Sequence, residues 1–397
     1  MSCDSMRVLV IGAGVFGAAA AVELRRRGHE VSLIDAGSSP HPDAASTDIS
    51  KVVRLDYATD LFYTGLMEQA MPRWRQYNER WGRPLFHETG FVVLRSVAME
   101  AGEFEHDSFT TLTARGHELE RLDAESLGQR FPAWRSDAYC DGYYNPQGGW
   151  AESAEVVAAL IAEGTERGVR VQSDSPVASL IEKGSRVCGV QLASGQRYEA
   201  DCVVVACGAW TCKLLPGLAS LLSVVGQPVV HFKPPEPGRF MPPDFVPWAA
   251  DIAAKGWYGF CDNGQGIVKV AHHGPGVPCD AAGERSVPEA FAARVRDFTH
   301  RSLPALVDAP IVAHRLCLYC DSADGDFIID RDPGREGLVV AAGGSGHGFK
   351  FMPILGDLIA DVVEGGESLS RFAWRTESNT QRLTDAARCT MESHRVE

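Results

Sequence analysis

The sequence predicts an α/β protein, α+β overall, in which a parallel-sheet domain built from separate parts of the chain carries an inserted and mainly antiparallel domain. Three observations support this fold class. A strand–turn–helix–strand unit occupies residues 6–35, and buried strands recur at residues 201–207 and 337–342. Residues 217–316 lose this alternation of strand and helix and become rich in strands. The segments of the parallel-sheet domain therefore come from both ends of the chain and from its middle.

The chain has 397 residues, which is long enough for two domains with sizeable cores. Each switch between the two sequence patterns marks a predicted boundary. We expect the first domain to comprise residues 1–85, 145–216 and 318–397, and the inserted domain to comprise residues 86–144 and 217–317.

The composition excludes several classes of partner. Lys and Arg number 38 against 52 Asp and Glu, so the net charge is −14, and such a chain repels phosphate backbones and anionic membrane surfaces. We therefore expect no nucleic-acid or membrane partner. No signal peptide is indicated, and the 11 cysteines show no framework spacing, so we expect reduced thiols and a cytoplasmic protein. Cys317 and Cys320 form one C-x-x-C pair without the second pair that a zinc site needs, so no metal is expected.

The first unit contains a glycine-rich turn of the form G-x-G-x-x-G. Gly12 permits the tight turn, Gly14 lets the backbone approach a pyrophosphate, and Gly17 lets the helix pack against the strand. The helix start offers unpaired N–H groups to phosphates, and Asp35 at the end of the second strand can accept a hydrogen bond from a ribose hydroxyl. We expect a strand at 6–10, a helix at 18–27 and a strand at 29–34. The complete unit predicts dinucleotide binding.

The remaining elements follow from periodicity and from breaker residues. A helix is predicted at residues 154–167 and another at residues 354–363. The predicted strands are 169–171, a hairpin-like series at 175–182, 187–192 and 196–199, then 201–207 and 337–342.

Four segments together resemble a known family. They are the N-terminal VLVIGAGVFGAAAAVEL with Asp35, the loop DISKVVR at residues 48–54, the set Tyr258, Lys269 and His273, and RLCLYCDSADGDFIID at 315–330 with GGSGHGFKF at 343–351. The chain resembles flavin-dependent amine oxidases of the monomeric sarcosine oxidase type, related to fructosyl-amino-acid oxidases and L-pipecolate oxidases within the D-amino-acid oxidase superfamily. The resemblance implies a Rossmann-like FAD-binding domain and an inserted antiparallel substrate domain.

The resemblance also implies covalent FAD, joined by a thioether from a cysteine to the 8α-methyl group of the flavin ring. Cys317 stands at the matching place, ten residues before Phe327, whereas Cys320 does not. The alternative is that Cys317 is a buried strand thiol and that the FAD is held without a covalent bond.

For the reaction, the resemblance implies four catalytic groups, Lys269, Lys51, Tyr258 and His273. Lys269 would stabilise the charge that develops when reduced flavin meets O2; its alternative is a solvated lysine at a strand edge. Lys51 supplies positive charge near the flavin where sarcosine oxidases carry Arg, which puts sarcosine itself in doubt as the best substrate. Tyr258 and His273 would line the amine pocket, although His272 adjoins His273 and leaves their assignment open.

Substrate and cofactor contacts are implied in the same way. Lys350, with Arg54 as its partner, would bind the substrate carboxylate, and Gly346 would border the substrate. For Arg54 the alternative is a salt bridge with Asp56 or Asp48. The residues expected to contact FAD are Gly12, Gly14, Val15, Phe16, Gly17, Asp35, Ser46, Lys51, Val177, Gly208, Trp210, Cys317, Gly344, Gly346, His347, Gly348, Phe349 and Lys350.

The expected function is oxidation of a secondary amino acid, N-alkyl or cyclic, to an imine, with O2 reoxidising the flavin to give hydrogen peroxide. The expected partners are a small-molecule amine and O2, and the expected state is a monomer or small homo-oligomer. Three alternatives stay open: a flavin dehydrogenase with another electron acceptor, a biosynthetic tailoring oxidase for a bulkier amine, and a non-catalytic flavin-binding subunit.

Overall fold

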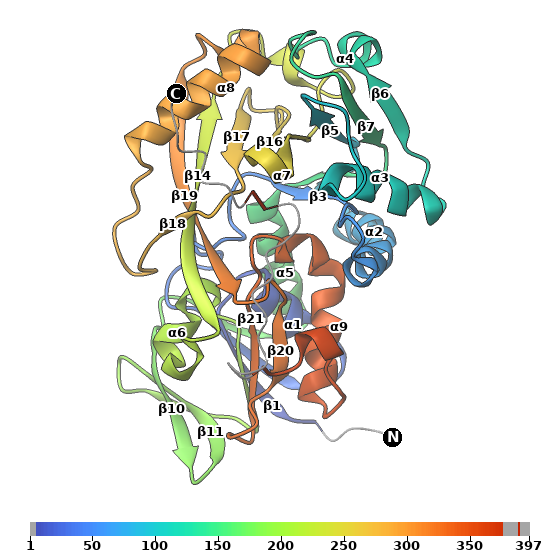
Figure 1. The fold of residues 1–397 in the computed structure, drawn as a ribbon. Helices are drawn as coiled ribbons and strands as arrows, with labels where there is room; N and C mark the ends of the chain where they lie inside the picture. Colours follow the sequence, from blue (N-terminus) through green and yellow to red (C-terminus); the bar gives the residue numbers. More distant parts are fainter. Residues whose placement is uncertain (1–4, 376–387, 390–397) are drawn as a thin grey trace.

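Figure 1 shows the computed structural model, which describes residues 5–375 and 388–389. Its lower half is built on a six-stranded sheet with the strand order β20-β21-β13-β1-β2-β9. β20 pairs with β21 in the antiparallel sense, and the other neighbours are parallel. The strands are β1 (Arg7–Ile11), β2 (Glu30–Ile34), β9 (Arg170–Gln172), β13 (Cys202–Val205), β20 (Ile328–Arg331) and β21 (Leu338–Ala342). This confirms the parallel sheet that the sequence predicts.

Both faces of this sheet are covered, which explains its continuous apolar strands. Successive side chains of a strand point to opposite faces. Val8 and Val10 enter the core shared with the helices, whereas Leu9 and Ile11 enter the core on the other face. The helices are α1 (Val15–Arg26), α5 (Ser153–Glu166) and α9 (Met352–Val363), and α1 packs against the other two. The other face carries β10 (Val177–Lys183), β11 (Arg186–Leu192) and β12 (Arg197–Glu199).

The upper half contains a second, mainly antiparallel sheet (Figure 1). Its strand order is β18-β14-β17-β16-β15-β5-β7-β6, with β19 paired to β14. The strands are β5 (Phe91–Arg95), β6 (Glu120–Asp123), β7 (Asp141–Asn145), β14 (Leu222–Phe232), β15 (Trp248–Ala250), β16 (Trp257–Phe260), β17 (Val268–His272), β18 (Val277–Pro278) and β19 (Ile311–Ser322). Large aromatic side chains, among them Trp134, Trp248 and Phe298, fill its core.

The helices of this half are α3 (Phe104–Ala114), α4 (Ala124–Arg130), α7 (Ile252–Lys255) and α8 (Glu289–Ser302). The long helix α2 (Leu61–Trp81) packs against α9 in the lower core. A small sheet of β3 (Lys51–Val53), β8 (Gly149–Ala151) and β4 (Phe86–His87) lies near the middle of the molecule. The short helix α6 (Thr211–Leu214) follows β13.

The two longest strands, β14 and β19, run side by side from the upper half into the lower half (Figure 1). β19 is continuous from Ile311 to Ser322, so the boundary expected between residues 317 and 318 falls inside a strand. The sequence pattern could not show this, because one apolar strand serves both halves. The C-terminal part of the predicted first domain lies outside the described residues beyond position 375, apart from residues 388–389.

Candidate active site

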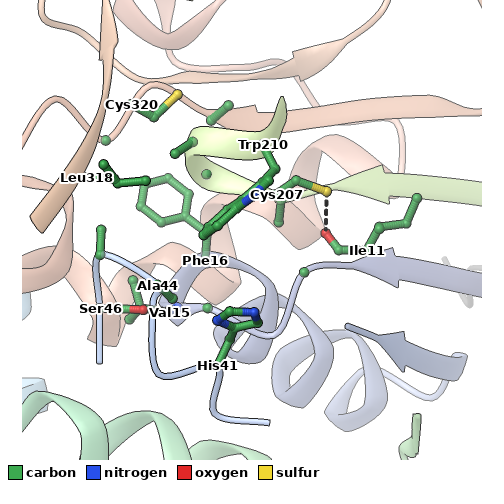
Figure 2. A pocket seen from close by; sticks show the side chains of 18 of the residues that line it. Ile11, Val15, Phe16, His41, Ala44, Ser46, Cys207, Trp210, Leu318 and Cys320 are labelled. Atoms are coloured by element: carbon green, nitrogen blue, oxygen red, sulfur yellow. Dashed lines mark hydrogen bonds between the residues drawn. The ribbon is translucent and has the colours of Figure 1, made fainter. Parts of the chain in front are cut away.

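A cavity of about 560 Å³ lies at the carboxyl ends of β1, β2 and β13. This is the edge where open parallel sheets bind ligands. Figure 2 shows this cavity, with Leu318 and Cys320 of β19 on one side and Val15, Ala44 and Ser46 on another. Trp210 and His41 also line it. Ser46 was expected from the sequence, whereas His41, Ala44 and Ala45 of the same loop were not.

The glycine turn explains why backbone borders this cavity closely. Gly12 has φ +100°, and a Cβ atom there would lie 2.5 Å from the carbonyl oxygen of Ala206. A Cβ atom on Gly17 would collide with the carbonyl oxygen of Gly12. α1 starts after Gly14, which offers no side-chain cap, and the N–H of Val15 donates to Oγ of Ser46 at 3.2 Å. Gly14 and Val15 line the cavity, so the positive end of the helix lies at it. The carboxylate of Asp35 accepts hydrogen bonds from the backbone of Ala13 at 2.6 Å and Gly37 at 3.1 Å.

The structure brings most of the expected cofactor residues to this cavity. Those that line it are Gly12, Gly14, Val15, Phe16, Asp35, Ser46, Lys51, Val177, Gly208, Trp210, Gly344, Gly346, Gly348 and Phe349. Among the described residues, four expected contacts do not line it. Gly17 packs beneath Gly12, and His347 and Lys350 line a neighbouring cavity instead. Cys317 is buried, whereas Cys320 lines the large cavity.

The neighbouring cavity is smaller, about 70 Å³, and lies between the two sheets. Four residues line both cavities, so the two adjoin: Lys51, Tyr319, Gly346 and Phe349. The apolar residues that line the small cavity are Val52, Phe91, Ala249, Ile252 and Phe260. Charged and polar groups, described next, make up most of the remaining lining.

Two buried cations, Arg54 and Lys350, line the small cavity. The Lys350 ammonium donates to the hydroxyl of Tyr57 at 2.8 Å, and the guanidinium of Arg54 lies 5.3 Å from the centre of the Tyr57 ring. Arg54 donates to the backbone carbonyl of Asp56. Between the described residues Arg54, Asp48 and Asp56 there is no salt bridge, so this alternative is wrong.

Phenol and imidazole groups form the next part of the small cavity. The hydroxyls of Tyr258 and Tyr319 lie 3.5 Å apart, and burial raises the pKa of each phenol, so both stay neutral. His273 lines the cavity. Its neighbour His272 packs elsewhere, with Nε2 3.0 Å from the carbonyl oxygen of Lys255, and burial lowers the pKa of His272 to about 4. The structure thus separates the two histidines that the sequence left ambiguous.

Lys269 is buried. It is absent from the described residues that line the two cavities. It lies on β17, directly across from His231 of β14 and Phe260 of β16. Its Nζ atom donates to Oδ2 of Asp48 at 2.5 Å and to the carbonyl oxygen of Ser50 at 2.7 Å. Lys269 is therefore not the solvated edge lysine of the alternative reading.

The two cysteines of the C-x-x-C pair lie in different surroundings on β19. The Sγ atom of Cys317 lies 3.4 Å from Nζ of Lys51, and an ammonium group at this distance stabilises negative charge on sulfur. Burial raises the pKa of Cys320 to about 12, so that thiol stays protonated. The Lys51 ammonium thus contacts Cys317, whereas it is Cys320 that lines the large cavity.

Several residues of the site were missed from the sequence. Tyr319 lies inside RLCLYCD, and Tyr57 lies three residues after the end of DISKVVR. The available signal was a tyrosine in or near a segment that resembles the family. Asp48 was considered only as a partner of Arg54. Its pairing with Lys269, 221 positions away, left no trace in the sequence.

Within residues 5–375 and 388–389, no group of three or more His, Cys, Asp or Glu side chains could hold a metal ion. Over the same residues no helix has both the length and the apolar character required to cross a bilayer.

Comparisons with known proteins agree on one family. Residues 7–362 match a family described as FAD dependent oxidoreductase. L-saccharopine oxidase of Schizosaccharomyces pombe is 27% identical over 96% of this chain and 95% of its own length. N-methyl-L-tryptophan oxidase of Salmonella heidelberg is 28% identical, with 90% and 94% covered. Monomeric sarcosine oxidase of a Bacillus species is 26% identical, with 91% and 93% covered.

Solved structures share the whole fold. A mutant of Amadoriase I from Aspergillus fumigatus superposes with a TM-score of 0.82 at 25% identity and covers 97% of this chain and 95% of its own. A fructosyl peptide oxidase from E. terrenum gives a TM-score of 0.82 at 21% identity, with 97% of both chains covered. The mixed α/β architecture predicted from the sequence is confirmed.

Proposed function

Because this chain belongs to the family of FAD dependent oxidoreductases, we propose that it oxidises a secondary amino acid, N-alkyl or cyclic, to an imine and passes the electrons to O2. The observation that carries this proposal is the contact between the two cavities. A glycine-lined cavity at the sheet edge shares four residues with a small cavity that contains Arg54 and Lys350. A carboxylate held by these cations places the adjacent amine at the junction.

The large cavity fits FAD by the chemistry of its lining. Gly12 and Gly17 leave no space for a Cβ atom, Gly14 provides no side-chain cap at the start of α1, and Asp35 directly follows β2. These features suit a pyrophosphate and a ribose hydroxyl. When bound there, FAD supplies the chemistry of accepting a hydride from the carbon next to the amine and returning the electrons to O2 as peroxide.

The residues of the small cavity prepare the substrate. Arg54 and Lys350 bind its carboxylate, and Arg54 offers a planar pair of donors. The apolar wall around Phe91 and Ile252 excludes water from the amine. Desolvation and the nearby cations both lower the pKa of a bound amine, so the pocket favours the neutral amine, whose lone pair assists hydride loss.

The volume of the small cavity favours a compact substrate. At about 70 Å³, it suits an N-methyl or cyclic amino acid better than a long or branched one. The curated relatives are named for sarcosine, N-methyl-L-tryptophan and L-saccharopine, so all three belong in the substrate panel alongside pipecolate, proline and fructosyl amino acids.

The experiment is anaerobic mixing of the purified protein with this panel while the flavin absorbance is recorded. We expect bleaching by at least one secondary amino acid and a weak response to a matched control amine that lacks the carboxylate, such as piperidine beside pipecolate. No bleaching by any secondary amine would contradict the proposal and favour a non-catalytic flavin-binding subunit.

We further propose that the FAD is attached through Cys317. The support is the Lys51 ammonium 3.4 Å from its sulfur, together with the protonated state of Cys320. After denaturation in acid, flavin should stay with the wild-type polypeptide and with Cys320→Ala but not with Cys317→Ala. Flavin that leaves the wild-type chain on denaturation would contradict the covalent bond while leaving the oxidation proposal intact.

A further inference from the structure

Asp48 is a buried carboxylate at the place where the two halves of the molecule meet. It lies in the loop between β2 and β3 and is 2% exposed. Its backbone carbonyl accepts hydrogen bonds from the N–H of Ala154, at 3.1 Å, and from the hydroxyl of Ser153, both at the start of α5. These bonds hold the loop to the lower half, while the side chain reaches β17 of the upper sheet.

The carboxylate of Asp48 lies between two lysines. Oδ2 is 2.5 Å from Nζ of Lys269 and 4.0 Å from Nζ of Lys51. Lys51 lines both cavities, whereas Lys269 is buried and lines neither. The Asp48 carboxylate is thus the counter-ion of both lysines.

The other contacts of Lys269 leave it dependent on this anion. Its Nζ atom also donates to the carbonyl oxygen of Ser50 at 2.7 Å and lies 4.3 Å from the centre of the Phe260 ring. Dipoles and ring faces solvate an ammonium only in part, and a buried charge without a counter-ion is costly. The charge of Lys269 therefore requires Asp48.

The remaining titratable groups around this pair come from β3, β14, β16 and β19. They are Lys51, His231, Tyr258, Arg315 and Cys317. Nε2 of His231 lies 3.7 Å from Oδ1 of Asp48. Burial lowers the pKa of His231 to about 4, and Lys269 and Arg315 act in the same direction. With His231 neutral, Asp48 faces the two lysines and Arg315 as the negative charge of the cluster.

We propose that Asp48 is the positioning residue of this cation cluster, whose carboxylate fixes Lys269 as an ammonium ion behind the Phe260 ring of the small cavity. This inference rests on the proposed function, in which Lys269 and Lys51 supply positive charge for the reaction with O2. Asp48 acts through the lysines, and it does not itself line either cavity among the described residues.

The charge states of the pair agree with this geometry. Burial opposes the charged form of Asp48, but the ammonium groups of Lys269 and Lys51 outweigh it and hold the pKa of the carboxyl well below its usual range. Burial lowers the pKa of Lys269 to about 8, and Asp48 counteracts that loss. Removing the carboxylate charge therefore lowers the pKa of Lys269 further.

The first test measures the reaction of reduced holoenzyme with O2 against pH in wild type, Asp48→Asn and Asp48→Glu. In wild type the rate constant should fall as pH rises through about 8. In Asp48→Asn this fall should move to lower pH by about one unit or more, a loss of about fivefold or more at pH 8, while anaerobic flavin reduction changes far less. Asp48→Glu keeps the charge and should recover most of the profile.

The second test does not depend on turnover. Thermal unfolding of the same holoenzymes is measured from pH 6.5 to 9.5, together with Lys269→Met and the double variant. Asp48→Asn should lower the unfolding midpoint by about 5 °C at neutral pH, and the deficit should shrink as Lys269 loses its proton. Adding Lys269→Met should restore part of the loss. Asp332→Asn is the control, because Asp332 is a 7% exposed carboxylate paired with Arg335 outside both cavities.

The outcomes separate this proposal from the proposed function. A wild-type holoenzyme that no amine reduces contradicts the function itself. A wild type that reacts with amines and O2, with a pH profile unchanged in Asp48→Asn and no rescue by Lys269→Met, overturns the role of Asp48 alone. If Asp48→Asn does not fold, the double variant Asp48→Asn/Lys269→Met decides. A double variant that also fails to fold overturns the role of Asp48, and a double variant that folds supports it.

Discussion

Nζ of Lys350 lies 2.8 Å from the hydroxyl oxygen of Tyr57, although 293 positions separate the two residues in the chain. Nε2 of His347 lies 3.0 Å from the carbonyl oxygen of Gly325, so it carries the proton, and Nδ1 accepts from the Tyr57 hydroxyl at 2.9 Å. The Tyr57 oxygen is thereby left to accept from Lys350. This chain of hydrogen bonds fixes one cation of the small cavity.

Replacing Lys350 should weaken substrate binding strongly. In Lys350→Met the substrate carboxylate loses one charge-assisted hydrogen bond, which is worth about 1.5–3 kcal/mol. KM should rise about 10- to 100-fold for the best substrate, as measured by steady-state peroxide release. Lys183→Met, at an exposed lysine of β10, should leave KM unchanged. An equal effect on an amine without a carboxylate would contradict the assigned role.

Replacing Tyr57 should have the same effect in weaker form. Tyr57→Phe keeps the ring beneath Arg54 and Lys350 but removes the oxygen that orients the ammonium. A lost hydrogen bond of about 1 kcal/mol predicts a rise in KM of about fivefold, with flavin content unchanged. A KM equal to that of wild type would show that Lys350 is oriented by other contacts.

Gly346 should tolerate no side chain, because it borders both cavities. Its φ is +76°, and a Cβ atom would overlap the ring of Tyr319. Gly346→Ala should therefore displace the shared wall and reduce kcat/KM by about tenfold or more. Gly365→Ala is the matched control, with φ +91° but no atom within 4 Å, so it adds backbone strain alone. Similar losses in both variants would mean that strain, and not the Tyr319 contact, is responsible.

Replacing Lys269 should separate the two halves of the reaction. Lys269→Met removes the buried ammonium behind the cavity wall and should slow reoxidation by O2 by about 100-fold or more, with a much smaller effect on anaerobic reduction by substrate. Stopped-flow absorbance measures both steps. If both rates fall by the same factor, Lys269 supports the structure of the site and not the reaction with O2.

The sequence predicted the first half of the site well because its signals are local. Gly12, Gly14 and Gly17 are required by a turn that closes within a few residues, and Asp35 follows at the end of the next strand. The parallel strands at 202–205 and 338–342 were recognisable from continuous apolar runs. Such features need no knowledge of pairing between distant segments.

The second half depends on register, which one sequence does not encode visibly. His231, Lys269 and Phe260 lie side by side only because β14, β17 and β16 pair in one specific alignment. The same holds for β19, where alternation puts Leu318 and Cys320 on one face and Cys317 and Tyr319 on the other, and where Leu318, Tyr319 and Cys320 all line the large cavity. The resemblance supplied Cys317 and Lys269, but not the contacts between them and Lys51 or Asp48.

The most direct test of amino-acid oxidation by O2 is the stoichiometry of the reaction. Purified protein is mixed with the best amino acid of the panel, and imine-derived product, O2 consumed and peroxide formed are measured together. We expect product, O2 consumed and peroxide formed in equal amounts. We also expect the same substrate to bleach the flavin when O2 is absent. Bleaching without O2 consumption would identify a dehydrogenase with another electron acceptor, and the absence of bleaching would contradict amino-acid oxidation at this site.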